Sequence, residues 1–256
     1  MNLLKSIIAQ YRNFKIAHFD KFEGRNLRKL RELHIGKRCF IIGNGPSLSA
    51  SDLTQIHDSG YISFAFNRIF YIFKDTSWRP TYYISQDEKM LAGCVNEVNA
   101  IKVKQKFIPI EMEWYYDIHL KNITPFHIVT SKDVYPDFSK DVSKYIANSA
   151  TVVYTAIQFA VYMGIREIYL LGVDHHFHIS QNANGEIVVD STAKDYFMEA
   201  YNKDKEQLYI PNPDKSTYTY IVARQYADAH GVKIYNATRG GKLEVFERVD
   251  FDSLFQ

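Results

Sequence analysis

The segment Arg38-Cys-Phe-Ile-Ile-Gly-Asn-Gly-Pro-Ser-Leu48 joins a short apolar run to a turn that contains two glycines. Its first five residues have the length and apolar character of a buried strand. After the turn, Ser49 or Ser51 can cap a helix that ends near His57, because a serine side chain satisfies a free N–H at a helix start. The segment therefore predicts the strand–turn–helix unit that opens an α/β domain.

Short apolar runs and helical segments keep alternating along the rest of the chain. The further predicted strands cover residues 61–66, 81–85, 106–110, 127–130, 167–171 and 232–235, and the further predicted helices cover 88–99, 149–163 and 216–230. Strands that alternate with helices indicate a mostly parallel sheet with helical crossovers. We therefore expect an α/β fold, a Rossmann-like three-layer domain.

The composition excludes several classes of protein. Of the 256 residues, 46% are hydrophobic and 23% are charged, which excludes a disordered chain, a collagen and a coiled coil. The two cysteines, Cys39 and Cys94, match no metal motif or disulfide framework, and Cys39 is expected to be a buried small hydrophobe. No apolar stretch is long enough to span a membrane and no signal peptide is recognisable, so we expect a cytoplasmic protein.

Residues 1–37 are interpreted as a basic amphipathic helical arm that precedes a catalytic domain of residues 38–256. The first 38 residues contain ten Lys or Arg and three acidic residues, a balance of +7 in a chain whose net charge is +2. The apolar residues that recur at helical spacing are Leu3, Leu4, Ile7, Ile8 and Tyr11. Two interpretations stay open: contact of residues 1–31 with an anionic membrane, at the inner face of the plasma membrane, or packing on the core or a second subunit.

The alternation of strands and helices breaks between about residues 178 and 214. This segment contains Gln-Asn-Ala-Asn-Gly at 181–185, a mixed-charge helical stretch at 192–207 and Pro211-Asn-Pro213. Insertions after the carboxyl end of a strand are where α/β proteins carry lids and substrate loops. We therefore expect a small lid insertion here.

The chemistry is expected at the carboxyl ends of the strands, where open parallel sheets hold their ligands. The residues that follow the predicted strands, and so converge on this crevice, are Gly43, Asn44, Gly45, Ser47, Asn67, Gln86, Asp87, Gly172, Asp174, His175, His176 and His178. Amides, hydroxyls, carboxylates and imidazoles would thus meet at one edge of the sheet.

The glycine turn suits an anionic ligand. Glycines allow close backbone approach, a following helix directs N–H groups at an anion, and Asn44 can bond a ribose or a phosphate. The turn lacks the Lys-Ser/Thr of a P-loop and the third glycine of the dinucleotide fingerprint, which argues against Walker-type ATP hydrolysis and NAD binding. A plain structural turn is the alternative interpretation.

The histidines of the 174–178 segment are better interpreted as phosphate ligands or general bases than as metal ligands. A zinc site needs three or four ligands at defined spacing, and neighbouring histidines on an extended segment point in different directions. Asp250-Phe-Asp252 has the Asp-x-Asp form of metal-dependent sugar transferases but no core strand before it, so we expect it to face solvent. Near the last helix, Tyr209 and Tyr218 could stabilise a leaving phosphate, although packing explains tyrosines equally well.

Five segments of the sequence resemble two related groups of proteins. They are Phe40-Ile-Ile-Gly-Asn-Gly-Pro-Ser-Leu48, Phe66-Asn-Arg-Ile-Phe-Tyr71, Asn148-Ser-Ala-Thr151, Gly164-Ile-Arg-Glu-Ile-Tyr-Leu-Leu-Gly-Val-Asp174 and Gly231-Val-Lys-Ile-Tyr235. One group is the bacterial sialyltransferases that modify lipooligosaccharide. The other is a domain family that includes the archaeal 6-hydroxymethylpterin diphosphokinases and the flagellin-modifying Maf proteins. The resemblance covers roughly residues 38–240.

The resemblance implies a variant nucleotide-sugar glycosyltransferase fold and transfer without a metal or other cofactor. The donor would be a CMP-activated nonulosonic acid, such as sialic acid, and the acceptor a sugar hydroxyl in surface polysaccharide or lipooligosaccharide. By position, Asn44 and Gly45 would meet the nucleotide phosphate or ribose, and Asn67 the sugar or phosphate. We expect no nucleic-acid partner, and a homo-oligomer remains open.

Three further positions follow from the same resemblance. Ser149 would hold the carboxylate of the donor, Gln86 stands near the family's cytidine contact, and His176 falls where the family contacts the leaving phosphate. The family's basic histidine is missing before the last helix, where Asp214 stands instead. The general base is therefore expected to be Asp214, or else His175, His176 or His178.

The missing histidine leaves two other functions open. A diphosphokinase of the pterin type would use the same glycine turn for ATP, with Mg²⁺ held by Asp87 and Asp174. A non-catalytic polysaccharide-assembly protein would keep the fold without the base. The glycosyltransferase is the function that the sequence favours.

Overall fold

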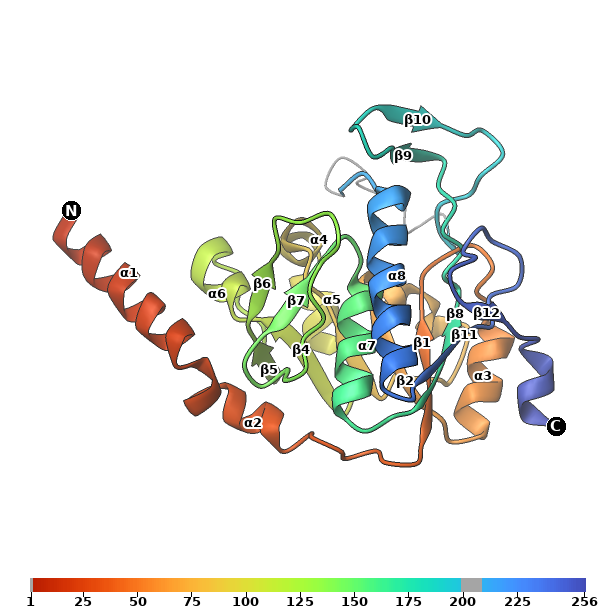
Figure 1. The fold of residues 1–256 in the computed structure, drawn as a ribbon, viewed down its shortest axis with the longest axis horizontal. Coiled ribbons are helices and arrows are strands. Elements are labelled where there is room, and N and C mark those ends of the chain that lie inside the picture. The colour runs from red at the N-terminus through yellow and green to blue at the C-terminus, as the bar shows by residue number, and fades with distance from the viewer. Residues whose placement is uncertain (1, 199–208) are drawn as a thin grey trace.

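The computed structural model describes residues 2–198 and 209–256, and their main sheet contains eight parallel strands (Figure 1). The spatial order is β12-β11-β8-β1-β2-β3-β4-β5. The strands are β1 (Arg38–Ile42), β2 (Ile62–Phe66), β3 (Tyr82–Ile84), β4 (Gln105–Pro109), β5 (Ile123–Phe126), β8 (Glu167–Leu171), β11 (Lys233–Asn236) and β12 (Glu247–Arg248). The α/β fold with a mostly parallel sheet is therefore confirmed.

The two faces of the sheet form two separate cores because successive strand residues point to opposite sides. In β1, Cys39 and Ile41 pack on one face, and Phe40 and Ile42 pack on the other. Long apolar strands buried on both faces are what a parallel sheet between two helical layers requires. The burial of Cys39 was predicted from its place in this run.

Helices cover both faces of the sheet. They are α2 (Gly24–Arg28), α3 (Ala50–Asp58), α4 (Glu88–Gly93), α5 (Val95–Ala100), α6 (Glu111–Tyr116), α7 (Val152–Tyr162) and α8 (Pro213–Ala229), with 3-10 helices η1 (Phe19–Lys21), η2 (Asn67–Lys74) and η5 (Asp252–Phe255). Helices α7 and α8 lie side by side on one face, whereas α3, η2, α4 and α5 pack on the other (Figure 1). This arrangement forms the three layers.

The structure differs from the sequence expectation at several elements. The predicted strand 127–130 corresponds to β6 (Ile128–Thr130), which pairs with β7 (Ile146–Asn148) outside the main sheet, and the main-sheet strand β5, just before it, was not predicted. The predicted helix 88–99 is broken at Cys94 into α4 and α5.

The insertion contains an antiparallel hairpin, β9 (Ile179–Gln181) and β10 (Ile187–Val189). Of the helix predicted over 192–207, residues 192–198 are not helical, and residues 199–207 lie outside the described residues. The Asn side chain at 182 accepts hydrogen bonds from the N–H groups of Asn184 and Glu186 and closes the hairpin turn. The Asn-rich segment 181–185 therefore forms the hairpin turn, and the mixed charges of 192–198 do not form a helix.

The N-terminal arm begins with helix α1 (Asn2–Ala17), which projects from the body of the molecule (Figure 1). Its apolar residues Ile7, Ile8, Tyr11 and Phe14 are exposed. Among the residues that the structure describes, no helix has the length and apolar character needed to cross a lipid bilayer.

Candidate functional site

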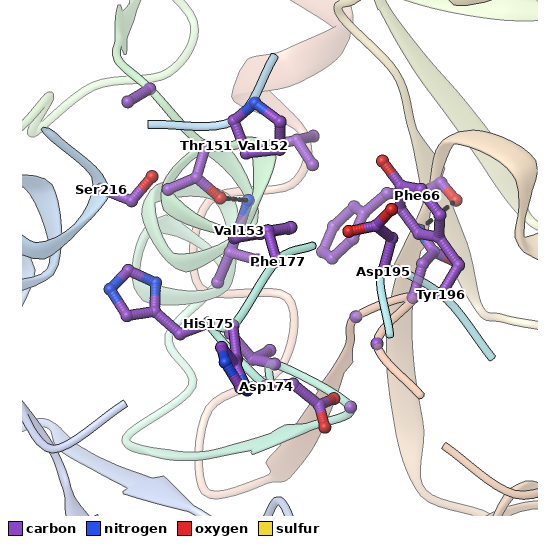
Figure 2. Close-up of a pocket in the computed structure, with 18 of the residues that line it drawn as sticks. Phe66, Thr151, Val152, Val153, Asp174, His175, Phe177, Asp195, Tyr196 and Ser216 are labelled. Atoms are coloured by element: carbon purple, nitrogen blue, oxygen red, sulfur yellow. Dashed lines mark hydrogen bonds between the residues drawn. The ribbon is translucent and has the colours of Figure 1, made fainter. Parts of the chain in front are cut away.

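A pocket of about 180 Å³ lies where the carboxyl ends of β1, β2 and β8 meet the N-terminal ends of α7 and α8 (Figure 2). The predicted residues that line it are Gly43, Asn44, Gly45, Asn67, Gly172, Asp174, His175 and His176. These residues come from three loops that are far apart in the sequence. The structure therefore brings together the central part of the site expected from the sequence.

The glycine turn packs directly against the loop after β8. The N–H of Gly45 donates to the carbonyl of Gly172 over 2.9 Å. A Cβ atom on Gly45 would lie 1.8 Å from Oδ2 of Asp174, and one on Gly43 would lie 2.2 Å from the carbonyl oxygen of Gly172. Both positions need glycine because no side chain fits between the two loops.

Asp174 fixes the far end of the turn. Its carboxylate accepts a 2.8 Å hydrogen bond from Oγ of Ser47 and a 3.3 Å bond from the Ser47 N–H. Burial raises the pKa of Asp174 above its usual value, and the two Ser47 bonds oppose that rise. Ser47 does not line the pocket, so it supports the turn through Asp174.

Two asparagines close the β1–β2 side of the pocket. Asn44 donates from Nδ2 to the carbonyl of Phe66 over 3.3 Å, and its buried Oδ1 has no hydrogen-bond partner in the described part of the chain. Asn67 adopts a left-handed conformation (φ +48°), and its Oδ1 accepts a bond from Ser85. The Asn44 oxygen is thus a candidate acceptor for a ligand hydroxyl or amino group.

His175 is held by a hydrogen bond that defines its tautomer. Oγ1 of Thr217 lies 2.8 Å from Nε2 of His175 and donates its own proton to the carbonyl of Pro213. With its single proton donated to Pro213, the Thr217 hydroxyl accepts from the Nε2–H of His175, and in this arrangement the lone pair of the neutral ring lies on Nδ1. Burial lowers the pKa of His175, so the ring is neutral near pH 7 and can act as a base.

His176 is held from the other side of the pocket. Its Nε2 lies 2.7 Å from Oδ2 of Asp190 at the end of the hairpin. Hydrogen bonds from Thr192, and then the one from His176, lower the pKa of Asp190, so this carboxylate is ionised at neutral pH. The Asp190 carboxylate therefore orients the His176 ring.

Several lining residues were missed by the sequence reasoning. They are Phe66, Ala150, Thr151, Val152, Val153, Val173, Phe177, Asp195, Tyr196, Pro211, Asn212 and Ser216. Thr151 caps α7 by accepting from the N–H of Val153, and Asn212 caps α8 by accepting from the N–H of Lys215. These two caps, which are readable as helix-start residues, mark helix N-termini that face the pocket.

The electrostatics of the pocket come from its backbone rather than from cationic side chains. The described lining residues include the carboxylates Asp174 and Asp195 and the imidazoles His175 and His176, but no Lys or Arg. The N-termini of α7 and α8 supply partial positive charge. In Figure 2 the Asp174 carboxylate and the His175 ring point in opposite directions.

Three predicted contacts lie outside this pocket and have other partners. Gln86 bonds Asn148 and Thr155, and Asp87 caps α4 by accepting from the N–H of Met90. Ser149 bonds Thr219. Gln86 and Asp87 follow β3 as expected, and Ser149 was expected from the family resemblance, but helix capping and packing occupy their polar atoms.

The residues expected near the last helix also lie outside the pocket. Asp214 is exposed and accepts a 2.7 Å bond from the N–H of Ala183 in the hairpin turn, which removes it from the place a general base needs. Tyr209 is exposed and bonds Glu88, while Tyr218 lines a neighbouring groove and packs at a tilt against Tyr135. The helix starts at Pro213 rather than 216, so Asp214 and Tyr218 both lie on α8, outside the lining of the pocket.

The donor set does not fit a protein-held Mg²⁺ ion. Both oxygens of Asp174 are engaged by Ser47, and Asp87 caps a helix. Within the described residues, no group of three or more His, Cys, Asp or Glu side chains is placed to hold a metal. Asp250 and Asp252 are exposed, as expected, and Asp252 pairs with Arg239.

Comparison with solved structures places the fold. The chain resembles the Maf glycosyltransferase from Magnetospirillum magneticum AMB-1 with a TM-score of 0.51 and 14% identity, over 93% of this chain and 39% of that one. The chain thus spans about two fifths of the Maf protein. It also resembles the sialyltransferase CstII from Campylobacter jejuni, in complex with the substrate analogue cytidine-5'-monophosphate, with a TM-score of 0.49 and 15% identity over 84% and 85% of the two chains.

Sequence comparison gives the family. No curated protein matches the sequence. A family model described as 6-hydroxymethylpterin diphosphokinase MptE-like matches residues 9–180, which is more than half of the chain. The chain therefore belongs to the 6-hydroxymethylpterin diphosphokinase MptE-like family.

Proposed function

We propose that this protein is a glycosyltransferase that moves a nonulosonic acid from a CMP-activated donor to a glycan of surface polysaccharide or lipooligosaccharide. The fold that it shares with the Maf glycosyltransferase supports sugar transfer. The pocket residues support the choice of donor.

The observation that carries the proposal is the way the pocket can bind an anion. Two helix N-termini and a glycine turn surround it, and the described lining residues contain no Lys or Arg. A CMP-nonulosonic acid carries one phosphate and one carboxylate, which uncharged N–H donors can bind. A nucleoside triphosphate carries more charge and is normally met by lysine and Mg²⁺.

The two histidines have different roles in the reaction: His175 acts on the acceptor and His176 on the leaving group. The acceptor hydroxyl attacks the anomeric carbon of the donor, a new C–O bond forms, and the bond to the phosphate oxygen breaks so that CMP leaves with the electron pair. His175 takes the hydroxyl proton on Nδ1, since Thr217 occupies its Nε2. In its imidazolium form, His176 keeps its Nε2–H on Asp190 and donates its Nδ1–H to the leaving phosphate. Asn44 and Gly45 contact the nucleotide in this proposal.

A pterin-type diphosphokinase is the second candidate because the matching family model has that description. It would bind ATP with Mg²⁺ held by substrate phosphates and one or two carboxylates. The engagement of Asp174 by Ser47 argues against it.

Calorimetry separates the two functions. We expect CMP to bind in the presence of EDTA, and Asn44→Ala to weaken that binding at least tenfold while thermal unfolding stays nearly unchanged. Binding of ATP only with Mg²⁺, together with no binding of CMP, would favour the diphosphokinase and overturn the transferase. Metal independence is tested by the same titration.

The proposal extends to an anionic membrane as the partner of the arm. Exposed Ile7, Ile8, Tyr11 and Phe14 lie on a helix within the most basic part of the chain, and such a helix binds lipid by burying apolar side chains beside anionic headgroups. Replacing Ile7 and Ile8 by Glu should abolish binding to phosphatidylglycerol vesicles, whereas the exposed hairpin variant Ile187→Glu should bind normally. Equal binding by both variants, or loss of a dimer instead, would assign the arm to another role.

A further inference from the structure

A second cavity, of about 540 Å³, lies beside the pocket between α8 and the segment 242–245. We propose that this cavity is the acceptor subsite and that it takes a neutral sugar whose hydroxyl is to be glycosylated. The inference rests on the proposed transferase function and adds where the second substrate binds.

His175 carries the inference because of its position. Among the described residues it is the one that lines both the donor pocket and the second cavity. A transferase needs its base to meet the acceptor hydroxyl beside the anomeric carbon, so the base must lie where the two substrates meet. A left-handed backbone at His175 (φ +54°), which is uncommon for a non-glycine residue, puts the ring in this wall.

The face of α8 explains why the two cavities share this wall. Ser216 and Tyr220 face the donor pocket, whereas Thr217 and Ile221, one residue further along, face the second cavity. Thr217 bonds the ring of His175 from the second cavity. The ring is thus held by a residue of the acceptor side and packs edge-on against Tyr220 of the donor side.

The lining of the second cavity indicates a neutral ligand. The cavity is lined by two cations, Arg224 and Lys242, and two carboxylates, Asp228 and Glu244, with Gln225 as an amide. Arg224 pairs with Asp228, whereas Lys242 and Glu244 pair with residues outside the lining. Side chains of Arg224, Asp228, Lys242 and Glu244 are each more than half exposed, so a chain end can enter from solvent. Such a mixture suits the many hydroxyls of a sugar, whereas Asp228 and Glu244 would repel a strongly anionic acceptor.

A third cavity, beside α7, is the competing location. It contains Ser149, Lys215 and Tyr218, but Ala150 is the described residue that it shares with the donor pocket. An alanine cannot move a proton, so a hydroxyl seated in this groove would have no base at the junction. The groove therefore provides the matched control.

The experiment fills each cavity in turn with a tryptophan side chain. It measures the ratio of transfer to hydrolysis with CMP-N-acetylneuraminic acid as donor. The acceptor probes are the methyl glycosides of galactose, glucose and N-acetylglucosamine. In transfer, the glycoside O–H loses its proton to His175, its oxygen bonds the anomeric carbon, and CMP departs; in hydrolysis, water replaces the glycoside. Ile221→Trp and the exposed Gln225→Trp should each lower the ratio at least tenfold, whereas Val134→Trp in the third cavity should not.

The outcomes separate this inference from the function on which it rests. An unchanged ratio in both α8 variants, or a loss confined to Val134→Trp, would overturn the acceptor subsite. Hydrolysis of the donor with no transfer to any of the three glycosides would overturn its neutral-sugar specificity. If the unmodified protein releases no CMP under any condition, the transferase function itself has failed, and CMP titration of each variant identifies damage to the donor pocket.

Discussion

The two walls of the donor pocket differ in what holds them in place. The sheet-side wall, residues 43–47 and 172–174, is joined by backbone hydrogen bonds and by the buried carboxylate of Asp174. The lid-side wall, residues 176–196, is held together internally by side-chain bonds from His176 to Asp190 and from the His178 N–H to the Asp195 carboxylate. Its hairpin turn is joined to the start of α8 by the bond from the Ala183 N–H to Asp214. Its hairpin residues Ile187, Val188 and Val189 are exposed.

The lid-side wall is the wall of the pocket that can change shape. Backbone contacts too close for a Cβ atom leave the sheet-side wall with one arrangement, so it fixes the position of the nucleotide. The pocket of about 180 Å³ is smaller than the roughly 300–1,000 Å³ of typical ligand sites. We therefore expect donor binding to displace the lid-side wall.

The largest effect is expected from a methyl group in the sheet-side wall. Gly45→Ala places its Cβ against Oδ2 of Asp174 and should weaken CMP binding more than 100-fold, with a loss of stability of about 1–3 kcal/mol. The control is Gly185→Ala in the hairpin turn, where φ is +86° and an added Cβ atom would have no heavy atom within 4 Å apart from its chain neighbours. This variant should lose about 1–2 kcal/mol of folding stability through backbone strain but bind CMP normally. Calorimetry and thermal unfolding check both; equal loss of CMP binding would remove the distinction between the walls.

Removing the base should lower turnover next most strongly. His175→Gln keeps a hydrogen-bond donor toward Thr217 but cannot take a proton, so we expect turnover to fall about 10²–10⁴-fold with CMP affinity within threefold. Product formation under saturating donor measures it. Turnover equal to that of the unmodified protein would exclude His175 as the base.

A smaller loss of turnover is expected when the lid-side wall is loosened. Asp190→Asn leaves the hairpin in place but no longer holds the His176 ring as an ionised partner, so turnover should fall about tenfold. Glu186→Gln, an exposed hairpin position that bonds Asn182, is the matched control. Equal turnover of the two variants in a steady-state assay would contradict the role of Asp190 in holding the His176 ring.

The smallest effect is on the pH dependence. Burial lowers the pKa of His175 below its ordinary value of 6.5, so activity should be full near pH 7 and fall as the pH drops through that lowered pKa. Thr217→Val removes the bond that fixes the tautomer and should shift this acid limb, while Thr217→Ser should restore it. A pH–rate profile of the three proteins measures the shift, and an acid limb that is identical in Thr217→Val would show that Thr217 does not position the ring.

The same contrast explains how much the sequence could predict. Strands β1, β2, β8 and β11 were predicted from apolar runs, because residues buried on both faces of a sheet leave an uninterrupted signal. The residues that follow β1 and β8 were therefore located correctly at the pocket. Residues that directly follow parallel strands must lie at the edge of the sheet where those strands end.

The insertion was located from the sequence, but its internal structure could not be predicted in the same way. Its hairpin depends on a turn at Asn182 and on bonds to residues far along the chain, such as Asp214 to Ala183. Periodicity over 192–207 indicated a helix, but local charge spacing says nothing of these distant partners. Asp214 and Tyr209 have partners that are likewise distant in the sequence, Ala183 and Glu88, and neither lines the pocket.

The most direct test of the central claim is a crystal structure of the protein with CMP. We expect the CMP phosphate between the N-terminus of α7 and the two histidines, with the ribose against Asn44 and the lid-side wall displaced outward. CMP bound elsewhere on the molecule, or a lid-side wall in an unchanged position at saturating CMP, would contradict this assignment of the donor pocket.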